Sequence, residues 1–267
     1  MKKILVVGKN SFLASNFIKR SDSILDITSI SHWELESVDF ESFSCVVNMA
    51  YHPTYFKTPY FEENDFDLRV AKALVGKPAH YFMMSTRKVY GVHPPFPATE
   101  DAPLVATDFY GKNKSVTEVA VRRLLGAQCT VLRLANIFGD EAGRHTFFGI
   151  ALANLKQHNR IVLDVSPFTL RDFLPVLDFS DMLVEIIQAA PSGVFNLGSS
   201  ITVPVGQIAL WVIEGFGSGE LMINTPRERD SFLLDCGLLY RKMGWTQKHP
   251  INVRTSCLEI GRRLRNA

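Results

Sequence analysis

An apolar run that ends in glycine constrains the fold more than any other feature of this sequence. Residues 4–7 are apolar and mostly β-branched, and Gly8 follows directly. Such a run is typical of a parallel strand that is covered on both faces. Apolar residues then recur at helical spacing: Phe12, Leu13, Phe17 and Ile18. With Asn10 or Ser11 available as the cap, the sequence predicts a strand, a tight turn and a helix.

The alternation of strand and helix continues through the first half of the chain. Apolar runs predict further strands at residues 24–30, 45–50, 80–84 and 129–134, and helical patterns lie between them at residues 65–74 and 114–125. Strands that alternate with helices indicate an α/β fold with a Rossmann-type, doubly wound parallel sheet.

The pattern changes after Gly139. Residues 147–156 predict a helix and residues 160–164 a strand, and the chain returns toward the core at Pro167. We therefore expect a Rossmann domain of residues 1–140 plus about 170–200. A small C-terminal lobe is expected to comprise residues from about 141 to 169 together with 201–267.

Charge and composition narrow the classes of function. The chain has 29 Lys and Arg against 27 Asp and Glu, a net charge of +2 that is too small for the electrostatic field that nucleic-acid binding requires. The N-terminal apolar run is too short for a signal peptide or a membrane span. We expect neither nucleic acid nor a membrane as a partner.

The cysteines indicate a reducing compartment. The chain has four, Cys45, Cys129, Cys236 and Cys257, and they lie far apart without a CxxC pair or any metal-ligand spacing. This usage predicts a cytoplasmic protein without a bound metal.

The first turn is a partial match to a dinucleotide-binding fingerprint. Gly8 is in place, but Ser11 and Ala14 occupy positions where the fingerprint has glycine. In a cofactor site the turn and the helix N-terminus would meet the pyrophosphate through Gly8, Asn10, Ser11, Phe12 and Leu13. The alternative is an ordinary turn between a strand and a helix.

The end of the second strand bears on the choice of cofactor. This strand ends near Ser31 and His32, and the sequence places there neither the acid that would bind the adenine ribose of NAD nor an arginine. Lys9 is available to a 2′-phosphate, which favours NADP over NAD. Alternatively, neither Lys9 nor the end of the second strand contacts the cofactor.

Tyr110 and Lys114 carry the strongest chemical signal. They are four residues apart, so on a helix that starts near residue 107 or 108 they share one face. A lysine there favours the charged form of the phenol and predicts a pKa below its usual value of about 10. Thr86, at the end of a neighbouring strand, is placed to hold a carbohydrate oxygen while the tyrosine exchanges a proton with it. The alternative is a pair on a solvated helix surface.

Five segments in the right order resemble one family. They are residues 85–91 (STRKVYG), 110–118 (YGKNKSVTE), 132–139 (LRLANIFG), 171–176 (RDFLPV) and 193–198 (GVFNLG). Together they resemble the extended short-chain dehydrogenases/reductases, the NAD-dependent epimerase/dehydratase family, over residues 1 to about 245.

The resemblance implies roles for individual residues. Thr86, Tyr110 and Lys114 would be the catalytic set, and Met49, Ala50 and Asn64 would line the cofactor together with the first turn, Ser31 and His32. Asn136, Arg171 and Arg227 would bind the diphosphate of a nucleoside-diphosphate sugar, because a guanidinium matches phosphate geometry. For Arg171 the alternative is an ion pair with Asp172 or another neighbour.

The chain also departs from the family pattern. Ser11 replaces a glycine, Asn113 the common serine, and Leu177 a frequent aspartate. Arg87 and Lys88 follow the threonine where the family's dehydratases carry Asp and Glu, so dehydration is disfavoured.

The resemblance therefore implies an NAD(P)-dependent reductase of a nucleoside-diphosphate 4-keto (deoxy)sugar, of use in polysaccharide biosynthesis. A sugar-nucleotide epimerase that retains its NAD is the alternative, and a non-catalytic dinucleotide-binding sensor is a third hypothesis. The family also implies a homodimer through an apolar stripe that is equally compatible with core packing. The stripe comprises Val116, Val119, Ala120, Leu124 and Leu125.

Overall fold

A six-stranded parallel sheet forms the centre of the molecule. The computed structural model of the chain describes residues 2–141, 144, 146–227, 231–245 and 251–267, with the side chains of residues 225–227 excepted. The strands lie in the order β2-β1-β3-β4-β5-β9. Their bounds are Lys3–Val7 (β1), Asp26–Ile30 (β2), Cys45–Asn48 (β3), His80–Thr86 (β4), Cys129–Leu134 (β5) and Gly193–Leu197 (β9). The predicted parallel sheet is confirmed.

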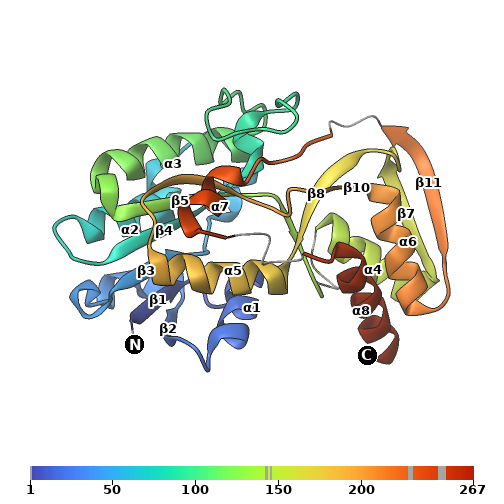
Figure 1. Ribbon diagram of the computed structural model, residues 1–267, viewed down its shortest axis with the longest axis horizontal. Helices are drawn as coiled ribbons and strands as arrows, with labels where there is room; N and C mark the ends of the chain where they lie inside the picture. Colours follow the sequence, from blue (N-terminus) through green and yellow to red (C-terminus); the bar gives the residue numbers. More distant parts are fainter. Residues whose placement is uncertain (1, 142–143, 145, 228–230, 246–250) are drawn as a thin grey trace.

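Helices cover both faces of this sheet (Figure 1). Helices α1 (Phe12–Ser21) and α5 (Val176–Ala189) lie on one face, and α2 (Phe66–Leu74) and α3 (Phe109–Leu125) lie on the other. Each turns an apolar stripe inward, so the doubly wound arrangement follows from burial of two separate cores. Helix α5 was not predicted, although Phe179, Leu183 and Ile186 in it have helical spacing.

The strand order reverses between β1 and β3, where consecutive connections leave for opposite sides of the sheet. In open α/β sheets ligands bind outside the carboxyl ends of the strands at such a point. Gly8 follows β1 there, and Met49 and Ala50 follow β3. Between β2 and β3 the chain makes two 3-10 helices, η1 (His32–Ser37) and η2 (Phe40–Ser42).

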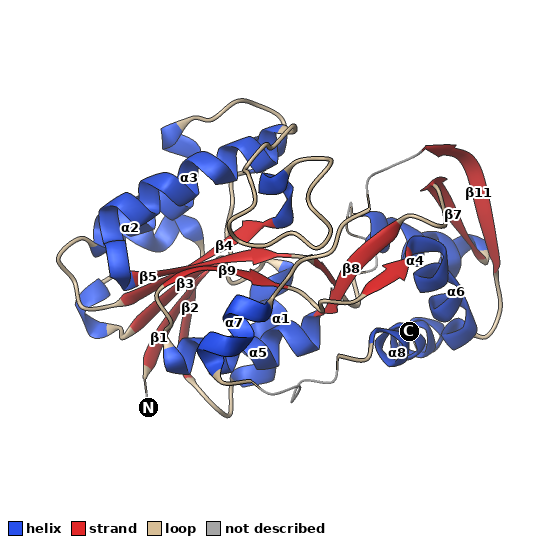
Figure 2. Ribbon diagram, turned by 45° about the horizontal axis from the view of Figure 1, so that its top comes forward, coloured by secondary structure: helices blue, strands red, loops and turns tan. Residues whose placement is uncertain are grey.

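A second lobe packs around a core of its own (Figure 2). It contains α4 (Phe147–His158), β7 (Arg160–Val165), α6 (Val205–Phe216), β11 (Glu220–Arg227) and α8 (Val253–Asn266), with β7 and β11 paired in parallel. A three-stranded sheet of β6 (Asn136–Phe138), β8 (Leu170–Pro175) and β10 (Thr202–Pro204) joins it to the central sheet. The predicted helix and strand after Gly139 are thus confirmed as α4 and β7.

One segment of the expected lobe returns to the first domain. Phe232 and Leu234 pack with Val89 and Tyr90, and Leu239 of α7 (Gly237–Met243) joins the core beneath α1 and α5. The division that we expected at residues 201–267 therefore does not follow the packing of this segment.

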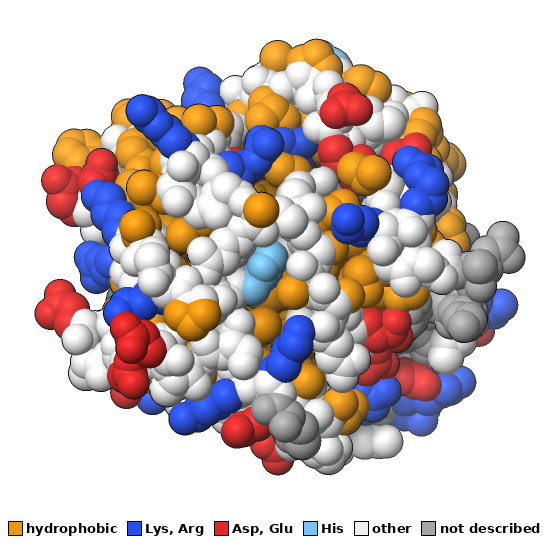
Figure 3. All heavy atoms as spheres, turned by 60° about the vertical axis from the view of Figure 1, so that its left-hand side comes forward, with side chains coloured by type: hydrophobic (Ala, Val, Ile, Leu, Met, Phe, Trp, Pro, Cys, Tyr) orange, Lys and Arg blue, Asp and Glu red, His pale blue; other side chains and the backbone are white. Residues whose placement is uncertain are grey.

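The surface carries charges of both signs. Figure 3 shows Lys and Arg side chains interspersed with Asp and Glu on the face that it presents. None of the helices in the described part of the chain is long and apolar enough to cross a membrane. On α3, Val116, Val119 and Leu124 of the apolar stripe are exposed, whereas Leu125 is buried in the core. The expected homodimer stays a prediction.

Candidate active site

Thr86 is the last residue of β4 and lies buried at its carboxyl end. Its side chain accepts a hydrogen bond from the Lys88 backbone at 3.3 Å and so caps the 3-10 helix η5 (Arg87–Tyr90). Ser85 points to the opposite face of the strand, where it donates to the Glu118 carboxylate. Because side chains alternate along a strand, the Thr86 hydroxyl lies on the other side from Ser85, next to the backbone of Lys88 in η5.

A glycine brings the first turn of α3 against η5. A Cβ on Gly111 would lie 2.5 Å from the Lys88 carbonyl oxygen, so only glycine permits this approach. Asp108 caps α3 by accepting from Gly111 N at 2.8 Å, and its carboxylate also pairs with Lys88 Nζ at 2.6 Å. Because Tyr110 directly precedes Gly111, these contacts hold it beside η5, which follows Thr86.

Tyr110 is half-buried under aromatic neighbours. Its ring stacks on Phe56 with centroids 4.2 Å apart and an interplanar angle of 11°, and Lys88 Nζ lies 5.9 Å from the ring centroid. Burial raises the pKa of the phenol above its usual value, and Lys114 opposes that rise. The predicted direction of the lysine's effect is confirmed, but the predicted net lowering of the pKa is wrong because burial outweighs it.

Lys114 lies one turn beyond Tyr110 and is buried against an acid. Its side chain is 3% exposed, and its ammonium forms an ion pair with Asp67 Oδ2 at 2.7 Å. Burial lowers the pKa of Lys114, but the attraction of Asp67 and of Tyr110 holds that pKa above its usual value. Asp67 was not predicted, since nothing in the local pattern of α2 marks it as the partner of a residue 47 positions away.

The segment between β3 and α2 is tied to α3 by Asn113. The Asn113 amide donates to the carbonyl oxygens of Tyr55 at 3.1 Å and Thr58 at 3.0 Å. The replacement of the family's serine therefore has a structural use here. Asn64, predicted to line the cofactor, donates to Thr54 Oγ1 at 3.1 Å within the same segment.

The first turn fits the pyrophosphate of a dinucleotide. Gly8 has φ +93°, and a Cβ there would lie 2.8 Å from Ala50 N, so the turn at the sheet end must be glycine. The Ser11 hydroxyl accepts from Ala14 N at 3.2 Å and caps α1. Because that hydroxyl is turned into the helix, it leaves the N–H groups of Phe12 and Leu13 at the helix N-terminus, where such groups are able to bind phosphate.

An acid lies close to the end of β2. Glu34 Oε2, in η1, accepts from Ser31 N at 2.7 Å and from Lys9 Nζ at 3.1 Å. The hydrogen bond from the Ser31 backbone and then that from Lys9 lower the pKa of Glu34. The premise for favouring NADP, that no acid is present there, is therefore wrong; the capping-box pattern of Ser31 and Glu34 was the available signal. His32 stacks on Phe66 with centroids 4.2 Å apart.

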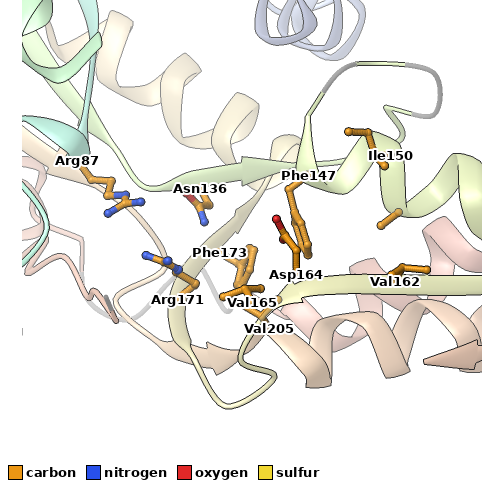
Figure 4. A pocket seen from close by; sticks show the side chains of 11 residues that line it. Arg87, Asn136, Phe147, Ile150, Val162, Asp164, Val165, Arg171, Phe173 and Val205 are labelled. Atoms are coloured by element: carbon orange, nitrogen blue, oxygen red, sulfur yellow. The ribbon is translucent and has the colours of Figure 1, made fainter. Parts of the chain in front are cut away.

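A pocket of about 410 Å³ lies where η5, β6 and β8 meet the second lobe (Figure 4). Arg87, Asn136 and Arg171 supply polar lining together with Asp164 of β7, and the two arginine side chains extend toward each other. Both lie over the Phe232 ring, with guanidinium carbons 3.9 Å (Arg87) and 5.1 Å (Arg171) from its centroid. The sequence analysis did not place Arg87 in a substrate site.

Two further expectations concern the arginines. Asp172, proposed as the alternative partner of Arg171, lies on the opposite face of β8 and accepts from Ser199 N at 2.8 Å. The side chain of Arg227 falls outside the described part of the chain. Among the described residues, no group of three or more His, Cys, Asp or Glu side chains is arranged to hold a metal ion.

Comparison with known proteins identifies the family. The model of the NAD dependent epimerase/dehydratase family matches residues 19–198, more than half of the chain. A search of curated proteins returned no match. Among solved structures, the protein is similar to the UDP-N-acetylglucosamine 4-epimerase from Methanobrevibacter ruminantium M1 in complex with UDP-N-acetylmuramic acid, with a TM-score of 0.84 and 16% identity over 98% of this chain and 97% of that one.

Two further structures carry a bound dinucleotide. One is the dTDP-glucose 4,6-dehydratase from Bacillus anthracis str. Ames in complex with NAD, with a TM-score of 0.83 and 17% identity over 98% of this chain and 96% of that chain. The other is RMD from Pseudomonas aeruginosa complexed with NADPH, with a TM-score of 0.79 and 17% identity over the whole of both chains. At these identities the likeness concerns the fold, and the family match carries the assignment. The chain belongs to the NAD dependent epimerase/dehydratase family, whose members are enzymes.

Proposed function

We propose that the protein is an NAD(P)-dependent reductase of a nucleoside-diphosphate 4-keto (deoxy)sugar, with Thr86, Tyr110 and Lys114 as its catalytic residues. The observation that carries this proposal is the position of Tyr110 in α3, which the close contact of Gly111 with Lys88 holds beside the carboxyl end of β4. A phenol carries its proton at neutral pH and can donate it, and burial of Tyr110 favours that form. Reduction of a ketone needs such a donor at the carbonyl oxygen.

When bound, a reduced nicotinamide would supply the hydride that the keto carbon takes up in the proposed reaction. The Tyr110 hydroxyl gives its proton to the carbonyl oxygen, which becomes the hydroxyl of the product. Thr86 holds that oxygen by donating its own hydroxyl hydrogen. The buried ammonium of Lys114 stabilises the phenolate that Tyr110 leaves behind, until a proton from water restores it.

The pocket supports a substrate that carries a diphosphate. Arg87 and Arg171 bring two positive charges to one side of it, and Asn136 adds an amide. Planar guanidinium groups bind phosphate oxygens in pairs, so both arginines are proposed to contact the diphosphate, with Arg227 as a further candidate. The bound sugar nucleotide in the similar epimerase from Methanobrevibacter ruminantium is in keeping with this substrate class.

The dinucleotide is proposed to lie across the reversal between β1 and β3. Gly8 and the N-terminus of α1 would hold its pyrophosphate, and Ser31, His32 and Glu34 would lie beside the adenosine. Both NAD and NADPH occur in structures of similar fold. Glu34 favours NAD, because a carboxylate can accept from the ribose 2′-hydroxyl and repels a 2′-phosphate.

Replacement of Tyr110 by phenylalanine tests the mechanism. Tyr110→Phe is expected to lower kcat by at least a hundredfold, the usual contribution of a general acid, and to leave the Kd for the dinucleotide within about twofold. The matched control is Tyr51→Phe, which removes the hydroxyl of an exposed tyrosine whose ring contacts Tyr110 edge-on. Single-turnover oxidation of NADH or NADPH by nucleoside-diphosphate 4-keto sugars measures the effect.

The outcome distinguishes three functions. Stoichiometric oxidation of added NADH or NADPH supports the reductase. Cofactor that copurifies and is unchanged after turnover identifies the epimerase instead. Undiminished turnover in Tyr110→Phe refutes the mechanism. If the wild-type protein binds a dinucleotide but turns over no sugar nucleotide, the non-catalytic sensor is the function that remains.

A further inference from the structure

Two buried acids at the start of α2 face α3, the helix that carries Tyr110 and Lys114. Asp67 is 3% exposed and Asp65 is 1% exposed, and both contact side chains of α3. Asp65 accepts from Thr117 Oγ1 at 2.7 Å and from Leu68 N at 2.9 Å, so it caps α2 and fixes it against α3. Asp67 has a different set of partners, which lead to the proposed catalytic residues.

Three donors converge on Asp67. Lys114 Nζ lies 2.7 Å from one carboxylate oxygen, and the Tyr81 hydroxyl at 2.6 Å and the Asn48 amide at 2.8 Å share the other. Asn48 in turn accepts from Ala50 N at 3.0 Å, so the same cluster reaches the residues that follow β3 at the reversal of strand order. A carboxylate held from three sides is fixed in position, and it fixes the ammonium opposite it.

The ion pair also sets the net charge beside Tyr110. A buried ammonium without a partner would exert a full positive charge on the phenol. Its charged form would be disfavoured, however, because burial removes the water that solvates it. With Asp67 in place the ammonium keeps its proton, and the two charges largely cancel at the distance of the phenol. Asp67 therefore determines both whether Lys114 is charged and how much of that charge Tyr110 experiences.

We propose that Asp67 is a positioning residue of the reaction, which holds the Lys114 ammonium in place and limits the positive charge that it exerts on Tyr110. The inference rests on the proposed roles of Tyr110 and Lys114. No direct contact of Asp67 with the sugar or the nicotinamide is involved.

The pH dependence follows from the charge of the cluster. In the wild-type protein Asp67, Lys114 and Tyr110 together are neutral, and loss of a proton makes them negative. In Asp67→Asn they carry one positive charge, so the first proton leaves at lower pH, and the midpoint belongs to Tyr110 and Lys114 jointly. The other titratable groups around them are Asp65 on α2, Tyr81 on β4, Tyr51 and Tyr55 before α2, Lys88 on η5 and Asp108 at the start of α3.

The experiment compares wild type with Asp67→Asn, using Asp65→Asn as the matched control because it removes an equally buried carboxylate of the same helix. The basic limb of kcat for ketone reduction is measured against pH. In parallel, the Tyr110 resonance is titrated by ¹³C NMR in protein labelled at tyrosine and assigned with Tyr110→Phe. For Asp67→Asn both midpoints are expected to move about one pH unit lower or more, and for Asp65→Asn by less.

A second variant tests the same inference without removing a charge. Tyr81→Phe deletes one donor to Asp67, which leaves the carboxylate a better partner for Lys114, so both midpoints are expected to move upward. If Asp67→Asn does not yield folded protein, this upward shift is the decisive measurement.

If Asp67→Asn lowers the melting temperature and leaves both midpoints unchanged, Asp67 is a purely structural acid and the proposal is overturned. If Asp67→Asn does not fold, unchanged midpoints in Tyr81→Phe overturn it in the same way. The proposed function fails separately, because full turnover of Tyr110→Phe refutes the catalytic role while the NMR midpoints still report on the cluster.

Discussion

At the scale of single residues, Glu34 and Lys9 set the charge at the end of β2, where the adenosine of the dinucleotide is proposed to lie. The pair lies beside the turn after β1, and both side chains are more than a third exposed. Glu34→Gln removes the charge that repels a 2′-phosphate and releases Lys9 to bind one. The variant is expected to improve the affinity for NADPH relative to NADH by roughly two- to fivefold, which is the scale of an exposed ion pair. Fluorescence titration of both dinucleotides measures this ratio.

Glu36→Gln is the control for that experiment, since Glu36 is an exposed acid of the same 3-10 helix. An equal change in both variants would mean that the net charge of the surface, and not the Glu34 carboxylate, sets the preference.

At the scale of the element, α1 depends on Ser11 for its cap. Loss of the hydroxyl in Ser11→Ala leaves Ala14 N without its acceptor and is expected to destabilise the protein by about 1 kcal/mol. Ser11→Gly is expected to cost only a few tenths of a kcal/mol, because glycine is itself tolerated as a cap. Thermal denaturation measures both, with Ser15→Ala on the exposed side of the helix as the control.

The same variants show whether Ser11 crowds the pyrophosphate. The hydroxyl is directed into the helix, so Ser11→Gly is expected to keep the dinucleotide Kd within about twofold of wild type. A Kd at least tenfold tighter in the glycine variant would contradict this placement.

At the scale of the whole molecule, Asp172 joins three segments distant in the sequence. Its carboxylate, in β8, accepts from Ser199 N at 2.8 Å and from Leu234 N at 3.4 Å. Burial raises the pKa of Asp172 to about 6, despite the hydrogen bonds that lower it. The folded state therefore binds more protons than the unfolded state between about pH 4 and 6, and this contribution to stability is lost as the pH rises through that range.

Asp172→Asn tests that linkage, since the amide resembles the protonated acid. The difference in unfolding free energy between variant and wild type is expected to change by about 2 kcal/mol in favour of the variant from pH 4 to 6.5. Urea denaturation at each pH measures it, and Asp22→Asn, at an exposed aspartate, is the control. A difference that stays constant with pH would show that Asp172 titrates at an ordinary pH in the fold.

Local patterns in the sequence were enough to predict β1, β3, β4 and β5 and the shared face of Tyr110 and Lys114, although not α5. The apolar run before Gly8, the four-residue spacing of Tyr110 and Lys114, and the threonine at the end of β4 are local patterns, and local patterns suffice for strands, helices and the residues that share a face. The parallel sheet followed from the alternation of these elements.

The surroundings of those residues follow from the way the chain folds in space. Asp67 meets Lys114 across 47 positions, Arg87 and Arg171 meet over Phe232, and residues 232–239 leave the second lobe for the first. Such contacts depend on how two helices or two lobes dock, which no periodicity encodes. The pKa of Tyr110 depends on them as well, because burial and neighbouring charge act through space, so the sequence indicated the lysine's effect but not the larger effect of burial.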